Sequence, residues 1–379
     1  MSSASHPFLH TYRRYPLTLV RGEGHRVQDD AGRWYLDACT GIAVQALGHN
    51  HPRVTRAIQD QLSRISHTSN LFSVPVVQEL AALVSRTFDD GAVFFTNSGV
   101  EANEAAVKLV RKHWWRQGRP DKDEILVLDN AFHGRTLLGI TMTPKAPYQE
   151  GFGPLVPGIR AVPVDTAAAH IGPRTAAIVL EPVQGEGGCR PVPHLDAIRA
   201  ACDREGALLV YDEIQCGLGR KGVLLQQPRP DIVTMAKAIG GGLPLGVMVA
   251  LRPDVQEGFA PGDHGSTFGG NPVSCAAGKA VLEVILEQRL WANCAAMGDR
   301  LMAGLRAAGA PEVTGKGLLV AARCGRENGP VLAALRARGV LTASSGADGI
   351  RFLPPFTITA GEIDELVEAF AGALADTAV

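Results

Sequence analysis

Short apolar runs alternate along the chain with segments that have the period of an amphipathic helix. Six runs are apolar at most positions, as expected of strands buried on both faces. They span 92–97, 124–129, 176–183, 207–214, 231–236 and 245–250. Helical spacing covers 99–117, 194–205 and a long stretch at 272–307. This alternation predicts an α/β fold, in which helices lie on the faces of a sheet.

The C-terminal part continues the alternation on a smaller scale. Its predicted elements are strands at 317–324 and 350–356 and helices at 331–339 and 362–376. We therefore expect a smaller α+β domain over 285–379, preceded by a large cofactor-binding domain over 56–284. Residues 1–55 carry short β-like pieces, including a hairpin at 25–38 with its turn at 30–32. This N-terminal segment is expected to join the small domain.

The composition narrows the class of protein. A chain of 379 residues is long enough for two or three domains, which suits an enzyme better than a small binding module. It carries 37 Lys and Arg against 38 Asp and Glu, a net charge of −1. No excess of charge would attract nucleic acid or an acidic membrane, so neither is an expected partner.

Seven cysteines are scattered along the chain without a C-x-x-C pair, which is typical of buried thiols in a reducing compartment. The first twenty residues lack the apolar run of a signal peptide. No apolar stretch approaches the roughly 18 residues of a membrane span. We expect a cytoplasmic protein.

Lys237 ends an apolar strand and is followed at once by Ala238-Ile239 and the glycines 240–242. Burying an ammonium group is costly and lowers its pKa, which is what a lysine needs to form an imine with a carbonyl compound. The alternative is a lysine that has left the sheet and lies in water. This segment alone does not decide between them.

Asp212 stands at the carboxyl end of another predicted strand. Ligands of open α/β sheets bind beyond the carboxyl ends of the strands, so this carboxylate would face the expected crevice. Such an acid could keep a ring nitrogen protonated. The alternative is an aspartate that caps a helix or fixes a loop.

A strand, a Ser98-Gly99 turn and a helix follow one another without a break at 92–117. The first N–H groups of a helix lack internal partners and lie at the positive end of its dipole, so a phosphate could bind there with Ser98 as a further donor. Ser98 could also be a plain N-cap, with Glu101 completing a capping box. The two roles are compatible.

An imine-forming lysine, a carboxylate for a pyridinium and a phosphate-binding helix start are together what pyridoxal phosphate requires of a protein. With these residues in view, the sequence resembles the class III aminotransferases, and among them the acetylornithine aminotransferases most. The matching blocks are GIAVQALGHNHP (41–52), FFTNSGVEANEAAVKL (94–109), NAFHGRT (130–136), LEPVQGEGG (180–188), YDEIQCGLGR (211–220), AKAIGGGLPLG (236–246), HGSTFGGNP (264–272) and IRFLPP (350–355). The resemblance implies a fold-type I transferase, with a mostly parallel central sheet in the large domain.

The resemblance also implies roles for the residues that would hold pyridoxal phosphate. Lys237 would bond covalently to it and later move the proton, while Asp212 would pair with the pyridine nitrogen. The other matching positions are Gln215 for the phenolic oxygen, Phe132 for ring stacking, Ser98, Gly99 and Val100 for the phosphate, and Thr267, which would reach the phosphate from a neighbouring subunit. A homodimer with composite sites is therefore implied.

For the substrates, the resemblance implies that Arg135 and Ser266 contact the acylated donor. Arg351 resembles the clamp for the carboxylate of 2-oxoglutarate, and Glu186 the acid that pairs with this arginine when another substrate is bound. Glu181 would line the same pocket.

The reaction implied is transfer of the terminal amino group of N2-acetyl-L-ornithine to 2-oxoglutarate, which gives N-acetyl-L-glutamate 5-semialdehyde and L-glutamate in arginine biosynthesis. Ornithine, acetylated or carrier-bound lysine, succinyl-ornithine and 4-aminobutyrate stay open as donors, because such enzymes share the cofactor site.

Other classes of function are less favoured. Gly217, Gly219 and Gly222 match G-x-G-x-x-G and would suggest a dinucleotide-dependent oxidoreductase, but Pro228 and Pro230 oppose the helix that this motif requires. His49, His51 and His264 have no acids at ligand spacing, so no metal site is expected. A regulatory protein derived from an enzyme stays open, although Lys237, Asp212 and Arg351 are all present.

Overall fold

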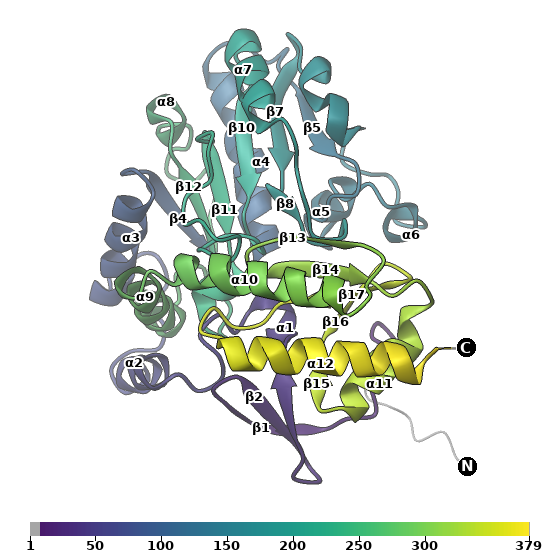
Figure 1. The fold of residues 1–379 in the computed structure, drawn as a ribbon. Coiled ribbons are helices and arrows are strands. Elements are labelled where there is room, and N and C mark those ends of the chain that lie inside the picture. The colour runs from purple at the N-terminus through teal and green to yellow at the C-terminus, as the bar shows by residue number, and fades with distance from the viewer. Residues whose placement is uncertain (1–7, 379) are drawn as a thin grey trace.

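A seven-stranded sheet forms the centre of the larger part of the molecule, in the upper half of Figure 1. The computed structural model describes residues 8–378, so residues 1–7 of the expected N-terminal segment lie outside it. The strands of this sheet, in spatial order, are β4 (Ala92–Thr96), β12 (Gly246–Ala250), β11 (Ile232–Met235), β10 (Leu208–Asp212), β7 (Thr175–Leu180), β5 (Glu124–Leu128) and β6 (Ile159–Val162). Only β12 runs antiparallel to its neighbours, which confirms the mostly parallel sheet.

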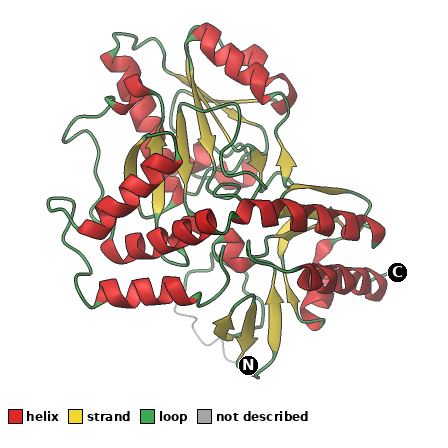
Figure 2. Ribbon diagram, turned by 60° about the vertical axis from the view of Figure 1, so that its left-hand side comes forward, coloured by secondary structure: helices red, strands yellow, loops and turns green. Residues whose placement is uncertain are grey.

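The six predicted strands are all present in this sheet. Its central strands β7, β10, β11 and β12 are buried at every position, since helices cover both faces, as the two views show (Figures 1 and 2). The edge strand β6 was not predicted from the sequence. Its exposed residues break the apolar pattern that identified the others.

The predicted helices are also present, with one correction. The helix at 99–117 is α4 (Gly99–Arg116), and the helix at 194–205 is α7 (Leu195–Glu205). The stretch 272–307 is two helices rather than one, α9 (Pro272–Glu287) and α10 (Leu290–Ala307). Arg289 between them has a left-handed backbone, with φ of 48°, which ends the first helix and turns the chain.

The remaining helices are mostly short or lie at the surface. They are α1 (Thr40–Ala43), α2 (Pro52–Leu62), α3 (Pro75–Thr87), α5 (Leu137–Thr141), α6 (Ala146–Gln149), α8 (Pro253–Gln256), α11 (Asn328–Ala337), α12 (Ala360–Asp376) and the 3₁₀ segments η1 (Val164–His170) and η2 (Lys237–Gly240). Residues 8–378 contain no helix that combines the length and the apolar character needed to cross a membrane.

Two four-stranded sheets lie below the central sheet in Figure 1. The first contains β1 (Leu19–Glu23), β2 (Arg26–Asp29), β3 (Trp34–Asp37) and β15 (Val340–Leu341), and the second β13 (Val313–Lys316), β14 (Leu319–Arg323), β17 (Gly349–Phe352) and β16 (Ala343–Ser345). A two-residue ladder joins β8 (Val183–Gln184) to β9 (Arg190–Pro191). Because β3 pairs with β15, the N-terminal hairpin and the C-terminal part share one sheet. The domain division at 55/56 and 284/285 stays a prediction, and α9 continues three residues past the second boundary.

The glycines of the G-x-G-x-x-G match pack against a helix. A Cβ on Gly219 would lie 3.1 Å from Trp291, and one on Gly222 would lie 3.1 Å from Ala295, both on α10. The chain after Gly222 runs through turns and bends to β11 without forming a helix. These glycines therefore allow close packing of a loop on α10, and no helix follows that could bind a dinucleotide.

Candidate active site

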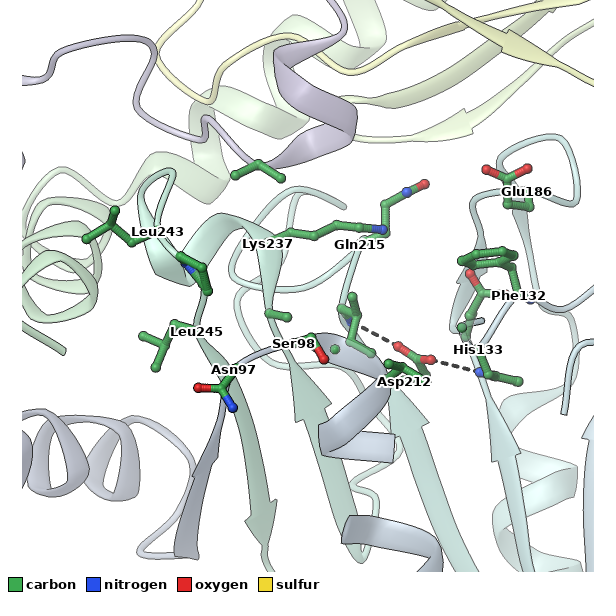
Figure 3. A pocket seen from close by; sticks show the side chains of 18 of the residues that line it. Asn97, Ser98, Phe132, His133, Glu186, Asp212, Gln215, Lys237, Leu243 and Leu245 are labelled. Atoms are coloured by element: carbon green, nitrogen blue, oxygen red, sulfur yellow. Dashed lines mark hydrogen bonds and ion pairs between the residues drawn. The ribbon is translucent and has the colours of Figure 1, made fainter. Parts of the chain in front are cut away.

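A cavity of about 390 Å³ lies at the carboxyl ends of the central strands. Asp212 is the last residue of β10, Lys237 comes two residues after β11, and Ser98 two residues after β4. Figure 3 shows these side chains around one space, with the turn of α1 above them. Nine of the predicted site residues line it, namely Ser98, Gly99, Val100, Phe132, Glu181, Glu186, Asp212, Gln215 and Lys237.

The Asp212 carboxylate is buried and held by three neighbours. Its Oδ2 lies 2.7 Å from Nδ1 of His133 and accepts a hydrogen bond from Asn103 Nδ2 at 2.8 Å. Its Oδ1 accepts a bond from the backbone N–H of Ile214 at 3.0 Å. The Thr234 hydroxyl in turn donates to the amide oxygen Oδ1 of Asn103 at 2.7 Å. This network fixes the carboxylate where β10 meets the cavity.

His133 is the ionic partner of Asp212. Burial opposes the charged imidazole, but the hydrogen bond and the negative charge of Asp212 outweigh it and raise the pKa of His133. Neither side chain has access to bulk water, with exposures of 0% and 3%. The raised pKa favours a positive imidazolium in direct contact with the acid, and both residues line the cavity (Figure 3).

Glu181 is the second buried acid of the cavity. Its carboxylate accepts hydrogen bonds from the backbone N–H groups of Phe132 at 2.9 Å and Gly185 at 3.2 Å. Burial raises its pKa to about 7, although the charge of His133 acts in the opposite direction. Glu181 therefore takes up or releases a proton near neutral pH, in contact with the backbone of Phe132.

Lys237 lies across the cavity from these acids. It is half-buried and has a left-handed backbone, with φ of 49°, which is unfavourable for a residue with a side chain. Burial lowers its pKa, against the attraction of Asp212. The structure therefore favours an amine that loses its proton easily, rather than the solvated lysine that the sequence left open.

The start of α4 forms another wall. Ser98 is its N-cap, and Ser98 Oγ both accepts from the N–H of Glu101 and donates to the Glu101 carboxylate at 2.9 Å. In a capping box, the Glu101 carboxylate would also accept from the backbone N–H of Ser98. Here it accepts from the backbone N–H of Asn97 instead, so the predicted capping box is incomplete. The N–H groups of Gly99 and Val100 have no intrahelical acceptor and border the cavity, as a phosphate site requires.

Arg351 enters the site from β17 of the smaller sheet. Its Nη2 donates to Glu186 Oε1 at 2.8 Å, and its Nη1 donates to Gln215 Oε1 at 3.3 Å. Burial disfavours the charge of Glu186, but Arg351 outweighs this and lowers the pKa of Glu186. The expected pairing of these two residues is thus present. Arg351 is 4% exposed and Glu186 is 30% exposed, so the acid is the partner that can move away.

Three predicted residues lie at the edge of the cavity or outside it. Arg135 is exposed, with its guanidinium 3.7 Å from the centre of the Tyr148 ring and 5.7 Å from that of Phe132. Ser266 Oγ accepts from Asn97, a lining residue, at 3.2 Å. Thr267 borders a separate hollow instead and does not line the main cavity.

The sequence reasoning missed His133 and Asn103. His133 stands directly after Phe132 in the NAFHGRT block, and Asn103 lies one turn into α4. Both were within the motifs, but only the fold shows that they reach Asp212, from 79 and 109 residues away in sequence.

The residues present fit pyridoxal phosphate. A buried carboxylate backed by His133 can hold a protonated ring nitrogen, the free N–H groups of Gly99 and Val100 can bind a phosphate, and an amine of lowered pKa faces the same space. Gly185 leaves room for Gln215, because a Cβ there would lie 1.9 Å from Gln215 Oε1.

The family model for class III aminotransferases matches residues 9–374, so the chain belongs to this family. The acetylornithine aminotransferase of Mesorhizobium japonicum is 42% identical to it, over 97% of this chain and 96% of that one. That of Xanthomonas axonopodis pv. citri is 43% identical, over 95% and 93%.

Solved structures agree with this assignment. The ornithine aminotransferase of Toxoplasma gondii is 30% identical and superposes with a TM-score of 0.92 over 97% of this chain and 92% of that one. An amine transaminase from an uncultivated Pseudomonas species, in its PLP-bound form, is 28% identical with a TM-score of 0.91 over the whole of both chains. Family membership confirms the expected fold, the aminotransferase activity and the pyridoxal phosphate cofactor.

The raised pKa of Glu181 predicts a pH-dependent stability. Between the ordinary pKa of 4.5 and about 7, the folded chain binds a proton at Glu181 that the unfolded chain does not. The free energy of unfolding of the cofactor-free protein should therefore fall as pH rises through this window, by about 3 kcal/mol. Glu181→Gln should remove this part of the pH dependence in urea titrations from pH 4.5 to 8.

Glu368→Gln is the matched control, because Glu368 is exposed on α12. It should leave the pH profile of the free energy of unfolding as in the wild type. A Glu181→Gln profile parallel to that of the wild type would show that Glu181 does not titrate as proposed.

Proposed function

We propose that this aminotransferase moves the terminal amino group of N2-acetyl-L-ornithine to 2-oxoglutarate, yielding N-acetyl-L-glutamate 5-semialdehyde and L-glutamate, a step of arginine biosynthesis. The observation that carries the two-substrate cycle is the Arg351–Glu186 ion pair beside Lys237. The choice of donor is supported by the name shared by the curated relatives, at 40–43% identity over nearly the full length.

We infer the following roles at the cofactor site. Pyridoxal phosphate, when bound, supplies the electron sink that allows a proton to leave the carbon bearing the amino group. Lys237 supplies the amine that bonds to it and carries that proton, and Asp212 holds the ring nitrogen proton. The phosphate would be held by the N–H groups of Gly99 and Val100, with Ser98 free to join once its hydroxyl turns away from Glu101.

Phe132, Gln215 and Glu181 complete that site in our proposal. Phe132 would cover one face of the ring, and its position is fixed by the bond from its N–H to Glu181. Gln215 would meet the phenolic oxygen with its amide Nε2, since its Oε1 already accepts from Arg351.

The Arg351–Glu186 pair lets one pocket accept two unlike substrates. A guanidinium binds a carboxylate through two parallel hydrogen bonds, so the carboxylate of 2-oxoglutarate can replace Glu186. When the donor has no carboxylate at this position, Glu186 stays on Arg351 and neutralises it. Arg135 and Ser266 would contact the acylated end of the donor at the rim.

The enzyme is further proposed to act in the cytoplasm. All seven cysteines are free, and six of them are buried, as expected in a reducing compartment.

A panel of amino donors tests the substrate. We expect kcat/KM for N2-acetyl-ornithine to exceed that for ornithine, N-acetyl-lysine, succinyl-ornithine and 4-aminobutyrate by roughly 10-fold or more, because discrimination resides in this ratio. Steady-state rates with 2-oxoglutarate as acceptor give the comparison. Ornithine is the main alternative, since a solved relative carries that name. A higher kcat/KM for ornithine would replace the proposed donor.

Arg351→Ala tests the carboxylate clamp. Loss of charge-assisted hydrogen bonds worth about 1.5–3 kcal/mol should raise KM for 2-oxoglutarate roughly 10- to 100-fold. Arg351→Lys should restore only part of the affinity, because an ammonium cannot form the planar fork. Arg323→Ala on the adjacent strand β14 removes an exposed, ion-paired arginine and serves as control. An unchanged KM in Arg351→Ala would remove the clamp from the mechanism.

A homodimer with composite sites is the second part of the proposal. Thr267 does not line its own cavity, and beside it lie large exposed apolar side chains, Leu71, Phe72 and Phe268, with exposures of 86%, 71% and 58%. Such a patch is typical of a protein interface. A second copy docked there would cover this patch and bring its Thr267 to the phosphate end of the site.

Mixed dimers of Lys237→Ala and Thr267→Glu subunits test this arrangement. If Thr267 serves the neighbouring site, one site of the mixed dimer has both an intact Lys237 and an intact Thr267, and about half of the wild-type activity should return. The Lys237→Ala homodimer should be inactive, and the added acid in Thr267→Glu should weaken retention of the cofactor phosphate. A mixed dimer no more active than the Thr267→Glu homodimer, or a monomer in sedimentation, would contradict the composite site.

A further inference from the structure

The turn of α1 has a left-handed backbone over four consecutive residues. The φ angles of Thr40, Gly41, Ile42 and Ala43 are 50°, 65°, 63° and 66°. Three of these residues carry a Cβ, and two are β-branched, so the conformation is costly for them. Runs of this kind persist only where the surrounding structure holds them, and they are concentrated at functional sites.

Asp37 holds the beginning of this turn. Its Oδ1 accepts hydrogen bonds from the backbone N–H groups of Cys39 at 3.0 Å and Thr40 at 2.7 Å. Its Oδ2 lies 2.8 Å from Nε2 of His49. With both oxygens engaged and only 5% of the residue exposed, Asp37 has a single available orientation.

His49 is itself locked in place. Its backbone exchanges two hydrogen bonds with Gly24, from His49 N to Gly24 O at 2.6 Å and from Gly24 N to His49 O at 3.0 Å. A Cβ on Gly22 would lie 2.7 Å from the His49 side chain, so this glycine leaves the space that the imidazole fills. The GHNHP block therefore fixes the partner of Asp37.

Held in this way, the turn borders the cavity of the candidate active site. Val44, the residue after the turn, lines the cavity together with Lys237 and Glu186. Thr40 Oγ1 donates to the carbonyl of Leu353 at 2.6 Å, and the N–H of Leu353 donates to Ala38 at 2.7 Å. Figure 3 shows the turn lying over Lys237. The two bonds with Leu353 join the turn and the segment before it to the chain two residues beyond Arg351.

We propose that Asp37 and His49 are positioning residues for substrate binding. They hold the left-handed turn, which places Val44 in the wall of the cavity that Lys237 also lines and secures the end of β17 beyond Arg351. Neither side chain lines the cavity, so both act through the turn. Their role deepens the proposed function and depends on it, since the affected ligands are the amino donor and the keto acid of that reaction.

His49→Phe is the decisive variant, because it keeps the ring but removes the nitrogen that faces Asp37. With the holoenzyme we expect KM for the amino donor and for 2-oxoglutarate to rise roughly five- to tenfold, while kcat changes less than about twofold. His49→Gln, whose Nε2 can take the place of the imidazole nitrogen, should keep both KM values within about twofold of wild type. The donor is the best substrate found in the panel, so failure of acetyl-ornithine as donor does not affect this comparison.

His25→Phe is the matched control. His25 bonds Glu362 at 2.9 Å and Thr357 at 2.8 Å and is buried to a similar degree as His49, but it does not line the cavity. Its backbone carbonyl accepts from the N–H of Asp37 at 2.9 Å, a bond that a side-chain substitution keeps. Its loss should lower Tm without changing either KM. KM values within twofold of wild type in His49→Phe, or an equal rise in His25→Phe, would overturn the proposal.

Thr40→Val keeps the test valid if His49→Phe does not fold, as judged by circular dichroism. It removes only the bond to Leu353 and should raise KM for 2-oxoglutarate, the substrate of Arg351, more than KM for the donor. An unchanged ratio of the two KM values would show that the turn does not position the end of β17.

Discussion

The structure of the site depends on one buried negative charge, the carboxylate of Asp212. A carboxylate removed from water is unstable unless its oxygens are paired, and here a histidine, an amide and a backbone N–H meet this requirement. These partners come from separate segments, the loop after β5, helix α4 and the turn after β10. The carboxylate can have its fixed position only when all three segments are packed, so the central sheet and the site form together.

The second constraint is the meeting of two sheets. The central sheet supplies Asp212, Lys237 and the start of α4 from the carboxyl ends of its strands, where open α/β sheets bind their ligands. Arg351 comes instead from β17 of the smaller sheet and reaches across to Glu186. The residues that we propose to hold the cofactor thus belong to one sheet and the proposed substrate clamp to the other. In that proposal, the relation between the sheets determines whether a carboxylate bound at Arg351 faces Lys237.

The strands and the residues at their ends could be predicted because they depend on local patterns. Apolar runs gave the buried strands, and glycines or polar residues after them marked the ends where Ser98, Asp212 and Lys237 lie. The break at Arg289 was missed because both helices around it have the same period and no glycine or proline separates them. The bonds of His133 and Asn103 to Asp212 join distant parts of the chain, and no local pattern encodes such a contact.

The turn of α1 shows why local preference cannot predict every functional feature. Thr40 and Ile42 are β-branched and disfavour a left-handed backbone, so propensity alone would assign them an extended conformation. The tertiary bonds from Asp37 to the turn and from Thr40 to Leu353 impose the other conformation. Val44 follows this turn and lines the cavity, and Arg351, two residues before Leu353, donates to Gln215 and Glu186, which also line it. The strained backbone therefore lies beside the proposed substrate site, where such strain is usually concentrated. A relaxed segment of the same length would leave Val44 and the end of β17 free to move independently.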